Sequence, residues 1–198
     1  MALRSDNTTH LPAKGKDTSV WEDTAHLIRE CIAQNRNAQK ALYNQYAPVA
    51  YAIIKRYTRQ SEMADEILND AFFKIFTKVE SYSGMGSFEG WIKRIVVNTI
   101  TDHLRKYIKN QQVYHASEMP EEVYINEDIV GKLSYKELLV VVHELPDTQR
   151  AVFNLYVFEE LKHKEIAETL GISEVNSRWH LNDARKRLKE KLNSIMKR

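Results

Sequence analysis

Residues 164–188 read KEIAETLGISEVNSRWHLNDARKRL, and their pattern predicts a helix, a tight turn and a second helix. Gly171 stands where the first helix must end in a left-handed residue, which glycine adopts without Cβ strain. Leu181, Ala184 and Leu188 recur at helical spacing, so they turn one side of the second helix toward the first. This combination is typical of a DNA-binding helix-turn-helix, with a helical hairpin of no DNA role as the alternative.

The second helix of this motif presents a face that is suited to reading bases. Steps of about 100° per residue place six side chains on or beside the face opposite the packed side: Val175, Asn176, Arg178, Trp179, Asn182 and Asp183. An arginine such as Arg178 can donate two hydrogen bonds to guanine, and an asparagine such as Asn182 can pair with adenine.

Basic residues beside that face suit contacts with phosphate. On the second helix these residues are Arg185, Lys186, Arg187, Lys189 and Lys191. Lys162 and Lys164 lie at the start of the first helix, where the helix dipole disfavours cations in isolation. A phosphate docked there would satisfy both the unpaired amides and the lysines.

The composition of the 198-residue chain indicates an all-α protein of the cytoplasm. Hydrophobic residues make up 43%, only 6 Gly and 4 Pro occur, and few segments alternate with a period of two. Cys31 is the only cysteine, so an internal disulfide or a cysteine zinc cage cannot form. No apolar run approaches the roughly 20 residues that span a bilayer, and no secretory signal is recognisable.

A change of composition near residue 110 divides the chain into two helical domains. Residues 110–130 contain ASEMPEEVYINED, which has acids but no Lys or Arg, and they predict an acidic linker. Residues 21–109 then form the first domain and residues 131–198 the second, and residues 1–20 form a disordered tail. The net charge is only +2, so any surface for nucleic acid must come from local clustering.

Apolar periodicity predicts four helices in each domain. The expected ranges are 21–34, 39–59, 61–79 and 88–109 in the first domain, and 132–145, 147–158, 165–170 and 173–195 in the second. Pro48 lies inside the second range, where a proline is expected to kink or break a helix.

The helix expected at residues 61–79 carries a polar face opposite its apolar stripe. Five residues fall on this face: Asp65, Glu66, Asn69, Asp70 and Lys74. From the pattern alone, the face is either a docking surface for a basic partner or a merely solvated surface.

The loop SYSGMGSFEGWIKR at residues 81–94 has three glycines before a basic helix, as a phosphate-binding loop does. A dinucleotide-binding loop requires a preceding strand, and a phosphate loop ends in Gly-Lys-Ser/Thr, so neither pattern is met. Flexible backbone, small polar groups and aromatic rings instead suit the capture of an unstacked base. A turn with ordinary core aromatics is the alternative.

Together these stretches resemble an extracytoplasmic-function (ECF, group IV) sigma factor of bacterial RNA polymerase. ADEILNDAFFKIF (64–76) resembles the polymerase-binding helix of region 2, and GSFEGWIKRIVVNTITDHLRK (86–106) resembles the loop and helix that read and melt the −10 element. LPDTQRAVFNLYVFEELKHKEIAETLGISEVNSRWHLNDARKRL (145–188) resembles the −35 reader of region 4. Within this stretch, the residues GISE…S…HL…AR resemble most closely those of Bacteroidetes members of the family.

The resemblance implies roles for individual residues. The polar face of 61–79 matches the surface that docks on the β′ clamp coiled coil. The −10 element would contact Ser83, Gly84, Met85, Gly86, Ser87, Phe88, Arg94, Asn98, Asp102, Arg105 and Lys106. The −35 element would contact Lys162, Lys164, Val175, Asn176, Arg178, Trp179, Asn182, Asp183, Arg185 and Lys186, of which the lysines and Arg185 suit its phosphates.

The resemblance also implies the partners. They are core RNA polymerase, through the β′ clamp coiled coil and the β flap, promoter DNA and, as in many relatives, an anti-sigma factor. The chain is expected to be monomeric when free and not to insert into a membrane. Three residues depart from the family: Asp183 replaces a common Arg, Lys162 a Ser helix cap, and Ser177 an inward Val. These departures bear on the −35 sequence rather than on the fold.

Two other classes of protein are weighed against this interpretation. A one-component helix-turn-helix regulator with a helical sensor domain would not need the loop at 81–94 or the basic helix after it. An enzyme is disfavoured because the histidines lack metal-ligand spacing and no Ser–His–Asp arrangement can be assembled. We therefore assign no catalytic residue, no metal ligand and no cofactor.

Overall fold

The computed structural model describes residues 23–108 and 135–196. The regular secondary structure within these residues is entirely helical. The elements are α1 (Thr24–Ile32), α2 (Arg36–Tyr57), α3 (Ser61–Lys78), the short 3₁₀ helix η2 (Val79–Ser81), α4 (Phe88–Ile108), α6 (Tyr135–His143), α7 (Asp147–Val157), α8 (His163–Leu170) and α9 (Glu174–Met196). The all-α fold class is thereby confirmed. The expected tail at 1–20 and linker at 110–130 lie outside the described residues.

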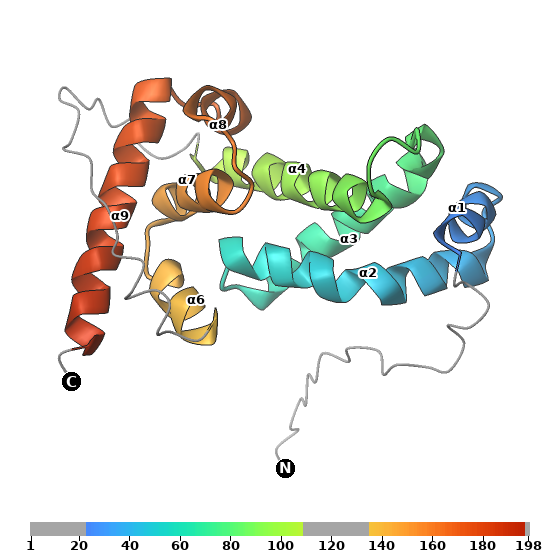
Figure 1. Ribbon diagram of the computed structural model, residues 1–198, viewed down its shortest axis with the longest axis horizontal. Helices are drawn as coiled ribbons and strands as arrows, with labels where there is room; N and C mark the ends of the chain where they lie inside the picture. The colour runs from blue at the N-terminus through green and yellow to red at the C-terminus, as the bar shows by residue number, and fades with distance from the viewer. Residues whose placement is uncertain (1–22, 109–134, 197–198) are drawn as a thin grey trace, which may run out of the picture.

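The first domain is built on α2, α3 and α4, and α1 packs at the start of α2 (Figure 1). Ile54, Ile67 and Ile100, one from each of the three long helices, are completely buried at their common centre. Burial of each such side chain contributes about 1.5–3 kcal/mol. α2 continues through Pro48, so the break considered at that proline does not occur.

The second domain packs α7 and α8 against the long helix α9, and α6 lies beside the lower part of α9 (Figure 1). Gly171 ends α8 with φ +70°, the left-handed conformation expected from the sequence. Its amide and that of Ile172 both donate to the carbonyl of Ala167, at 2.9 and 3.1 Å. Leu181, Ala184 and Leu188 are buried, which confirms the packed side of the second helix of the motif.

The two domains meet at the C-terminal end of α2. Helix ends leave carbonyl groups without intrahelical donors. Here His143 Nε2 donates to the Lys55 carbonyl at 2.5 Å, and Asn154 Nδ2 donates to the Arg56 carbonyl at 3.0 Å. Three successive carbonyls are satisfied in this way, because Arg150 Nε donates to the next one, that of Tyr57, at 2.9 Å.

Arg150 is the centre of this contact, and its side chain is buried. Besides Tyr57, its guanidinium donates to the Leu145 carbonyl at 2.9 Å and pairs with the Asp147 carboxylate. One residue thus joins the end of α2, the turn after α6 and the start of α7. Because a buried guanidinium is tolerated only when its donors are satisfied, these contacts fix its position.

Further contacts join the domains on either side of this centre. Arg56 Nη2 lies 2.9 Å from Glu159 Oε1, and the Arg56 guanidinium lies 4.6 Å from the centre of the Phe158 ring. On α4, Arg105 donates through Nε and Nη2 to the Thr169 carbonyl, at 3.0 and 2.6 Å. Each domain therefore caps a helix of the other. The second domain donates to the last carbonyls of α2, and α4 of the first domain donates to the last turn of α8.

Replacing Arg150 with lysine tests the importance of its forked donors. Lysine cannot reach the Tyr57 and Leu145 carbonyls together, so we expect Arg150→Lys to lower the free energy of unfolding by about 2 kcal/mol. Urea unfolding followed by circular dichroism measures this loss. Arg29→Lys, at an exposed position of α1, is the matched control and should change stability by less than about 0.5 kcal/mol. Equal effects of the two substitutions would contradict the proposed role of Arg150.

Candidate nucleic-acid and polymerase interfaces

The polar face predicted on α3 divides into two parts. Glu66 and Asn69 are exposed, whereas Asp70 and Lys74 interact with α4. Asp70 Oδ2 lies 2.8 Å from His103 Nε2, and Lys74 Nζ lies 3.0 Å from Asp102 Oδ2. Asp65 is half-buried. Two of the five residues assigned to polymerase docking therefore also tie α3 to α4.

The exposed part of α3 includes an aromatic residue that sequence analysis missed. Phe73 is 69% exposed, and it follows Asn69 by four residues and Glu66 by seven, so the three share one face. A large exposed aromatic ring beside acidic and amide groups is typical of a protein contact rather than of a merely solvated face. The available signal was the position of Phe73 outside the buried stripe formed by Phe72 and Ile75.

The glycine-rich loop before α4 is held from within. Gly84 and Gly86 have φ of +76° and +81°, conformations that other residues adopt only with strain. Tyr82 donates its hydroxyl to the Gly86 carbonyl at 2.7 Å, and Ser87 Oγ accepts from the Gly90 amide at 3.0 Å. Ser87 therefore caps the N-terminus of α4, in addition to any contact with DNA.

Aromatic rings form the base of this loop. Phe88 is buried and stacks on Trp91 with ring centres 5.5 Å apart, while Tyr82 lies at 5.0 Å from Phe88. Tyr82 and Trp91 are half-buried, and Met85 at the tip is 86% exposed. The accessible parts of the loop are therefore its backbone, Met85 and the small polar side chains, whereas Phe88 supports them from below.

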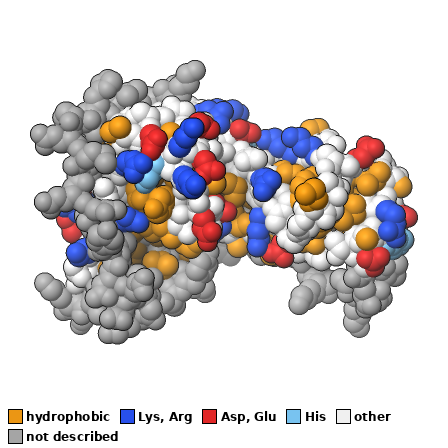
Figure 2. All heavy atoms as spheres, turned by 45° about the horizontal axis from the view of Figure 1, so that its top comes forward, with side chains coloured by type: hydrophobic (Ala, Val, Ile, Leu, Met, Phe, Trp, Pro, Cys, Tyr) orange, Lys and Arg blue, Asp and Glu red, His pale blue; other side chains and the backbone are white. Residues whose placement is uncertain are grey.

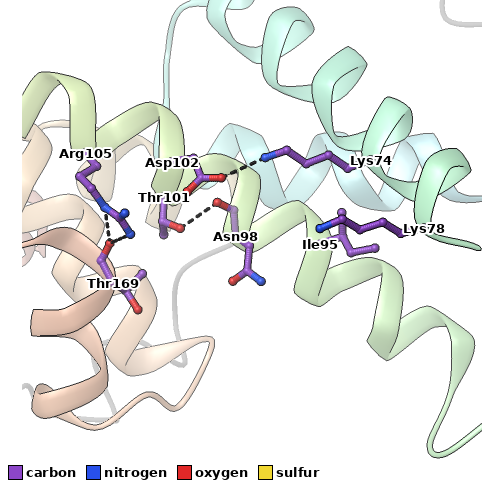
Figure 3. A pocket seen from close by; sticks show the side chains of 8 residues that line it. All are labelled: Lys74, Lys78, Ile95, Asn98, Thr101, Asp102, Arg105 and Thr169. Atoms are coloured by element: carbon purple, nitrogen blue, oxygen red, sulfur yellow. Dashed lines mark hydrogen bonds and ion pairs between the residues drawn. The ribbon is translucent and has the colours of Figure 1, made fainter. Parts of the chain in front are cut away.

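A polar cavity of about 320 Å³ lies between α3, α4 and the end of α8 (Figure 3). Eight residues line it: Lys74, Lys78, Ile95, Asn98, Thr101, Asp102, Arg105 and Thr169. The structure thus brings together three residues that sequence analysis assigned to −10 DNA, namely Asn98, Asp102 and Arg105. Arg94 and Lys106 of the same helix are exposed but do not line the cavity.

The predicted base-reading face of α9 is partly engaged within the chain. Ser173 Oγ caps α9 by accepting from the Asn176 amide at 3.0 Å, as its position suggested. Val175 is exposed, and Arg178 is exposed while paired with Glu174 at 2.5 Å. Asn182 is only 9% exposed, so its side chain must become accessible before it can contact a base. Trp179 and Asn176 are half-buried.

Two of the three departures from the family pattern make side-chain contacts within the chain. Asp183 accepts from Arg187 Nε at 2.8 Å and from Gln149 Nε2, so it ties α9 to α7. Ser177 is completely buried, and its Oγ lies 2.9 Å from His163 Nδ1 at the start of α8. Lys162 precedes α8 without a side-chain cap, and its amide donates instead to Glu165 Oε2 at 2.8 Å.

The remaining basic residues assigned to −35 phosphates lie at the surface of the second domain. Lys162, Lys164 and Lys186 are exposed, and the Arg185 guanidinium lies 5.5 Å from the centre of the Tyr156 ring. Figure 2 shows Lys and Arg side chains on both halves of the molecule, with acidic side chains between them. Positive charge therefore comes from local groups, as the small net charge requires.

Within residues 23–108 and 135–196, no helix is long and apolar enough to cross a membrane. The same residues contain no group of three or more His, Cys, Asp or Glu side chains arranged to hold a metal ion.

Comparison with known families matches both domains. Residues 42–109 match the model of sigma-70 region 2, and residues 135–188 match the model of sigma-70 region 4. The chain belongs to the sigma-70 family. It is therefore a sigma factor, a protein of transcription initiation.

Named relatives support the ECF group within this family. The chain is 28% identical over 161 residues to the ECF RNA polymerase sigma factor SigM of Bacillus subtilis (strain 168), covering 75% of this chain and 91% of that protein. It is 21% identical to the ECF RNA polymerase sigma-E factor of Haemophilus influenzae, covering 86% of this chain and 95% of that one. CnrH, solved in complex with the cytosolic domain of CnrY, aligns at 16% identity and a TM-score of 0.45, covering 85% of this chain and 96% of that one.

Titration of the half-buried His163 and the buried His180 should make the second domain less stable in mild acid. Burial lowers the pKa of His163 and of His180, so the folded protein holds both rings neutral. In the unfolded chain an imidazole takes up its proton near pH 6.5. Stability is then fully present above about pH 6.5 and declines as the pH falls below it, toward the lowered pKa values of the folded state.

Thermal unfolding at pH 7.5, 6.5 and 5.5 measures this dependence, because most carboxylates stay ionised over that range. We expect the midpoint to fall between pH 6.5 and 5.5 in the wild type. His163→Gln, which removes one titrating ring but retains a polar side chain beside Ser177, should show a shallower fall. A midpoint that is independent of pH in the wild type would contradict the assignment.

Proposed function

We propose that this sigma factor binds core RNA polymerase through α3 and brings it to promoters whose two elements are recognised by different domains. The helix-turn-helix of α8 and α9 reads the −35 duplex, and α4 with the loop at 83–87 opens and holds the −10 element. The observation that carries the proposal is the gathering of Asn98, Asp102 and Arg105 around one polar cavity, in a chain that also carries a helix-turn-helix. A regulator that binds only duplex DNA through its helix-turn-helix would not need this polar cavity as a second binding site.

Opening of the −10 element would be driven by binding rather than by a chemical step. The loop at 83–87 offers exposed amides and hydroxyls around two glycines of positive φ, and these groups can grip the edge of a displaced base. Capture of an unstacked base offsets the few kcal/mol that unpairing requires. Arg94, Arg105 and Lys106 would then hold the phosphates of the same strand.

Docking on polymerase would use the exposed part of α3. Glu66 and Asn69 can form polar contacts with a basic partner surface, such as that expected of the β′ clamp coiled coil, while Phe73 supplies apolar area at the centre. A second groove, of about 370 Å³, lies between α6 and α9 and is lined in part by Val141, Leu145 and Leu188. This groove is our candidate site for the β flap.

Recognition at −35 would depend on Val175, Asn176, Arg178 and Trp179 at the start of α9, with Lys162, Lys164, Arg185 and Lys186 on phosphates. Asp183 already accepts two hydrogen bonds within the chain, one of them from Arg187. Its role in recognition would therefore be to orient the Arg187 side chain. The Bacteroidetes-like grouping and control by an anti-sigma factor rest on the sequence resemblance alone and belong to the same proposal.

Run-off transcription tests the proposed function directly. Core polymerase would be supplied with a pool of DNA fragments that carry randomised −35 and −10 elements, with and without the chain. We expect transcripts from a subset of related fragments only when the chain is present. Sequence-specific binding of the chain to duplex DNA, with no change in transcription, would refute the proposal.

Charge reversal on α3 separates polymerase docking from DNA reading. Glu66 is the informative position, because Asp70 also pairs with His103 and its loss would disturb α3 packing. We expect Glu66→Lys to weaken binding to core polymerase by about tenfold, because it places like charge against a basic surface. Glu80→Lys, at another exposed acid of the first domain, is the matched control and should bind as wild type. Equal losses in both variants would contradict the assignment of α3.

A further inference from the structure

A buried hydroxyl group within the helix-turn-helix has a single partner. Ser177 lies on α9 between Asn176 and Arg178, two residues of the proposed base-reading face, but its own side chain is completely buried. Its Oγ lies 2.9 Å from Nδ1 of His163, the first residue of α8. Among the described residues, this hydroxyl has no other hydrogen-bond partner. Because a buried hydroxyl hydrogen requires an acceptor, the Ser177 hydroxyl donates to His163 Nδ1.

This bond determines which nitrogen of the imidazole carries the hydrogen. A neutral imidazole has one donor nitrogen and one acceptor nitrogen. Since Nδ1 of His163 accepts from Ser177, the ring hydrogen is on Nε2. Nε2 is bonded to no described residue and does not belong to the buried polar atoms that lack a partner, so solvent reaches it. His163 therefore presents one N–H group at the surface of the second domain.

The surroundings of His163 keep its ring neutral near pH 7. Burial lowers the pKa of the imidazole, and the neighbouring Arg178 and Arg185 lower it further, while Glu174 acts in the opposite direction. Protonation would also place a hydrogen on Nδ1 and leave the buried Ser177 hydroxyl without an acceptor. The N–H group at Nε2 is therefore a neutral donor, unlike the ammonium groups of nearby lysines.

Aromatic stacking fixes the plane of the same ring. The His163 ring stacks on Tyr156 of α7, with ring centres 4.9 Å apart and planes inclined by 26°. From α9, the Arg185 guanidinium lies 5.5 Å from the centre of the Tyr156 ring. The imidazole is thus held by α9 through Ser177 and by α7 through Tyr156. A side chain that is already fixed loses little rotamer freedom when it binds a ligand.

We propose that His163 is a DNA contact of the second domain, which donates from Nε2 to a backbone phosphate of the −35 duplex, and that Ser177 positions it. This inference rests on the proposed function. Lys162 and Lys164 flank His163 in the chain, both are exposed, and both are assigned to phosphates of the same element. A phosphate held between these lysines would lie beside the imidazole, and phosphate oxygens accept hydrogen bonds from neutral as well as charged side chains.

The proposal gives a reason for the departure from the family pattern at position 177. The valine that is usual there could pack against the His163 ring, but it could not donate to Nδ1. The ring hydrogen would then be free to occupy either nitrogen. Serine instead selects the tautomer that donates outward. This donor adds direction to phosphate binding without adding charge, so it displaces no counterion from the DNA.

Asparagine and glutamine at position 163 test the contact. The side-chain amide of asparagine lies near the position of Nδ1, whereas that of glutamine reaches the position of Nε2 and can donate to a phosphate. We expect holoenzyme with His163→Asn to bind the promoter fragments selected by run-off transcription about three- to tenfold more weakly. His163→Gln is the matched control and should bind within about twofold of wild type.

The salt dependence of the same binding separates a neutral donor from a charged one. At pH 7.5, neither substitution of His163 should change the slope of log affinity against log salt. Lys164→Ala, which removes a cation beside the ring, should lower that slope by about 0.9, the value for one phosphate of B-DNA. Thermal unfolding of each variant establishes that it is folded at the temperature of the binding measurement.

Nitrogen-15 NMR of the imidazole measures the effect of Ser177 directly, because protonated and unprotonated ring nitrogens have different chemical shifts. The His163 signals are identified by their absence from His163→Gln. We expect the wild type at pH 7.5 to carry hydrogen on Nε2 alone and Ser177→Ala to show both tautomers. Ser177→Ala should also bind the selected fragments more weakly, while the salt slope stays unchanged.

Each part of the inference has an outcome that would overturn it. Equal promoter affinities of His163→Asn and His163→Gln would exclude the phosphate contact. A salt slope lowered by His163→Asn as much as by Lys164→Ala would exclude a neutral donor, and hydrogen on Nδ1 in the wild type would exclude the positioning role of Ser177. These failures differ from failure of the proposed function, in which the wild-type chain would yield no selected fragments at all.

Discussion

The arrangement of this molecule depends on how the last carbonyl groups of α2 are satisfied. α2 ends against the second domain, where water cannot supply every missing donor, and His143, Asn154 and Arg150 donate to three successive carbonyls. An unsatisfied buried carbonyl costs about 1–3 kcal/mol, so each donor is required wherever the domains are in contact. The direction of α2 therefore sets the position of α7, and through α7 the positions of α8 and α9.

The same contact explains why polar residues interrupt the apolar pattern of α7. Arg150 and Asn154 lie one turn apart on the buried side of that helix, where an apolar side chain would be expected from periodicity. Asn154 also donates to the Arg150 carbonyl at 2.9 Å, so the two residues support each other. They specify one orientation of the domains, whereas apolar side chains at both positions would permit many orientations of similar energy.

Local physics allowed much of the fold to be predicted from the sequence. Gly171, Ser173 and the spacing of Leu181, Ala184 and Leu188 determine the helix-turn-helix, because caps and apolar stripes act over a few residues. The same reasoning located the Asn98–Arg105 face but not Lys78 or Thr169, which join it only after α3 and α8 pack against α4. The pairing of Lys74 with Asp102 spans 28 residues, and no periodicity within one helix can reveal it.

Hydrogen bonds to main-chain carbonyls give the domain contact a particular energetic character. Each such bond contributes only about 0.5–1.5 kcal/mol net, because water replaces the lost partner when the surface is exposed. A contact made mainly of apolar side chains would instead lose its hydrophobic stabilisation completely on opening. The reciprocal caps at α2 and α8 thus define a single closed geometry while keeping the free energy of separation small.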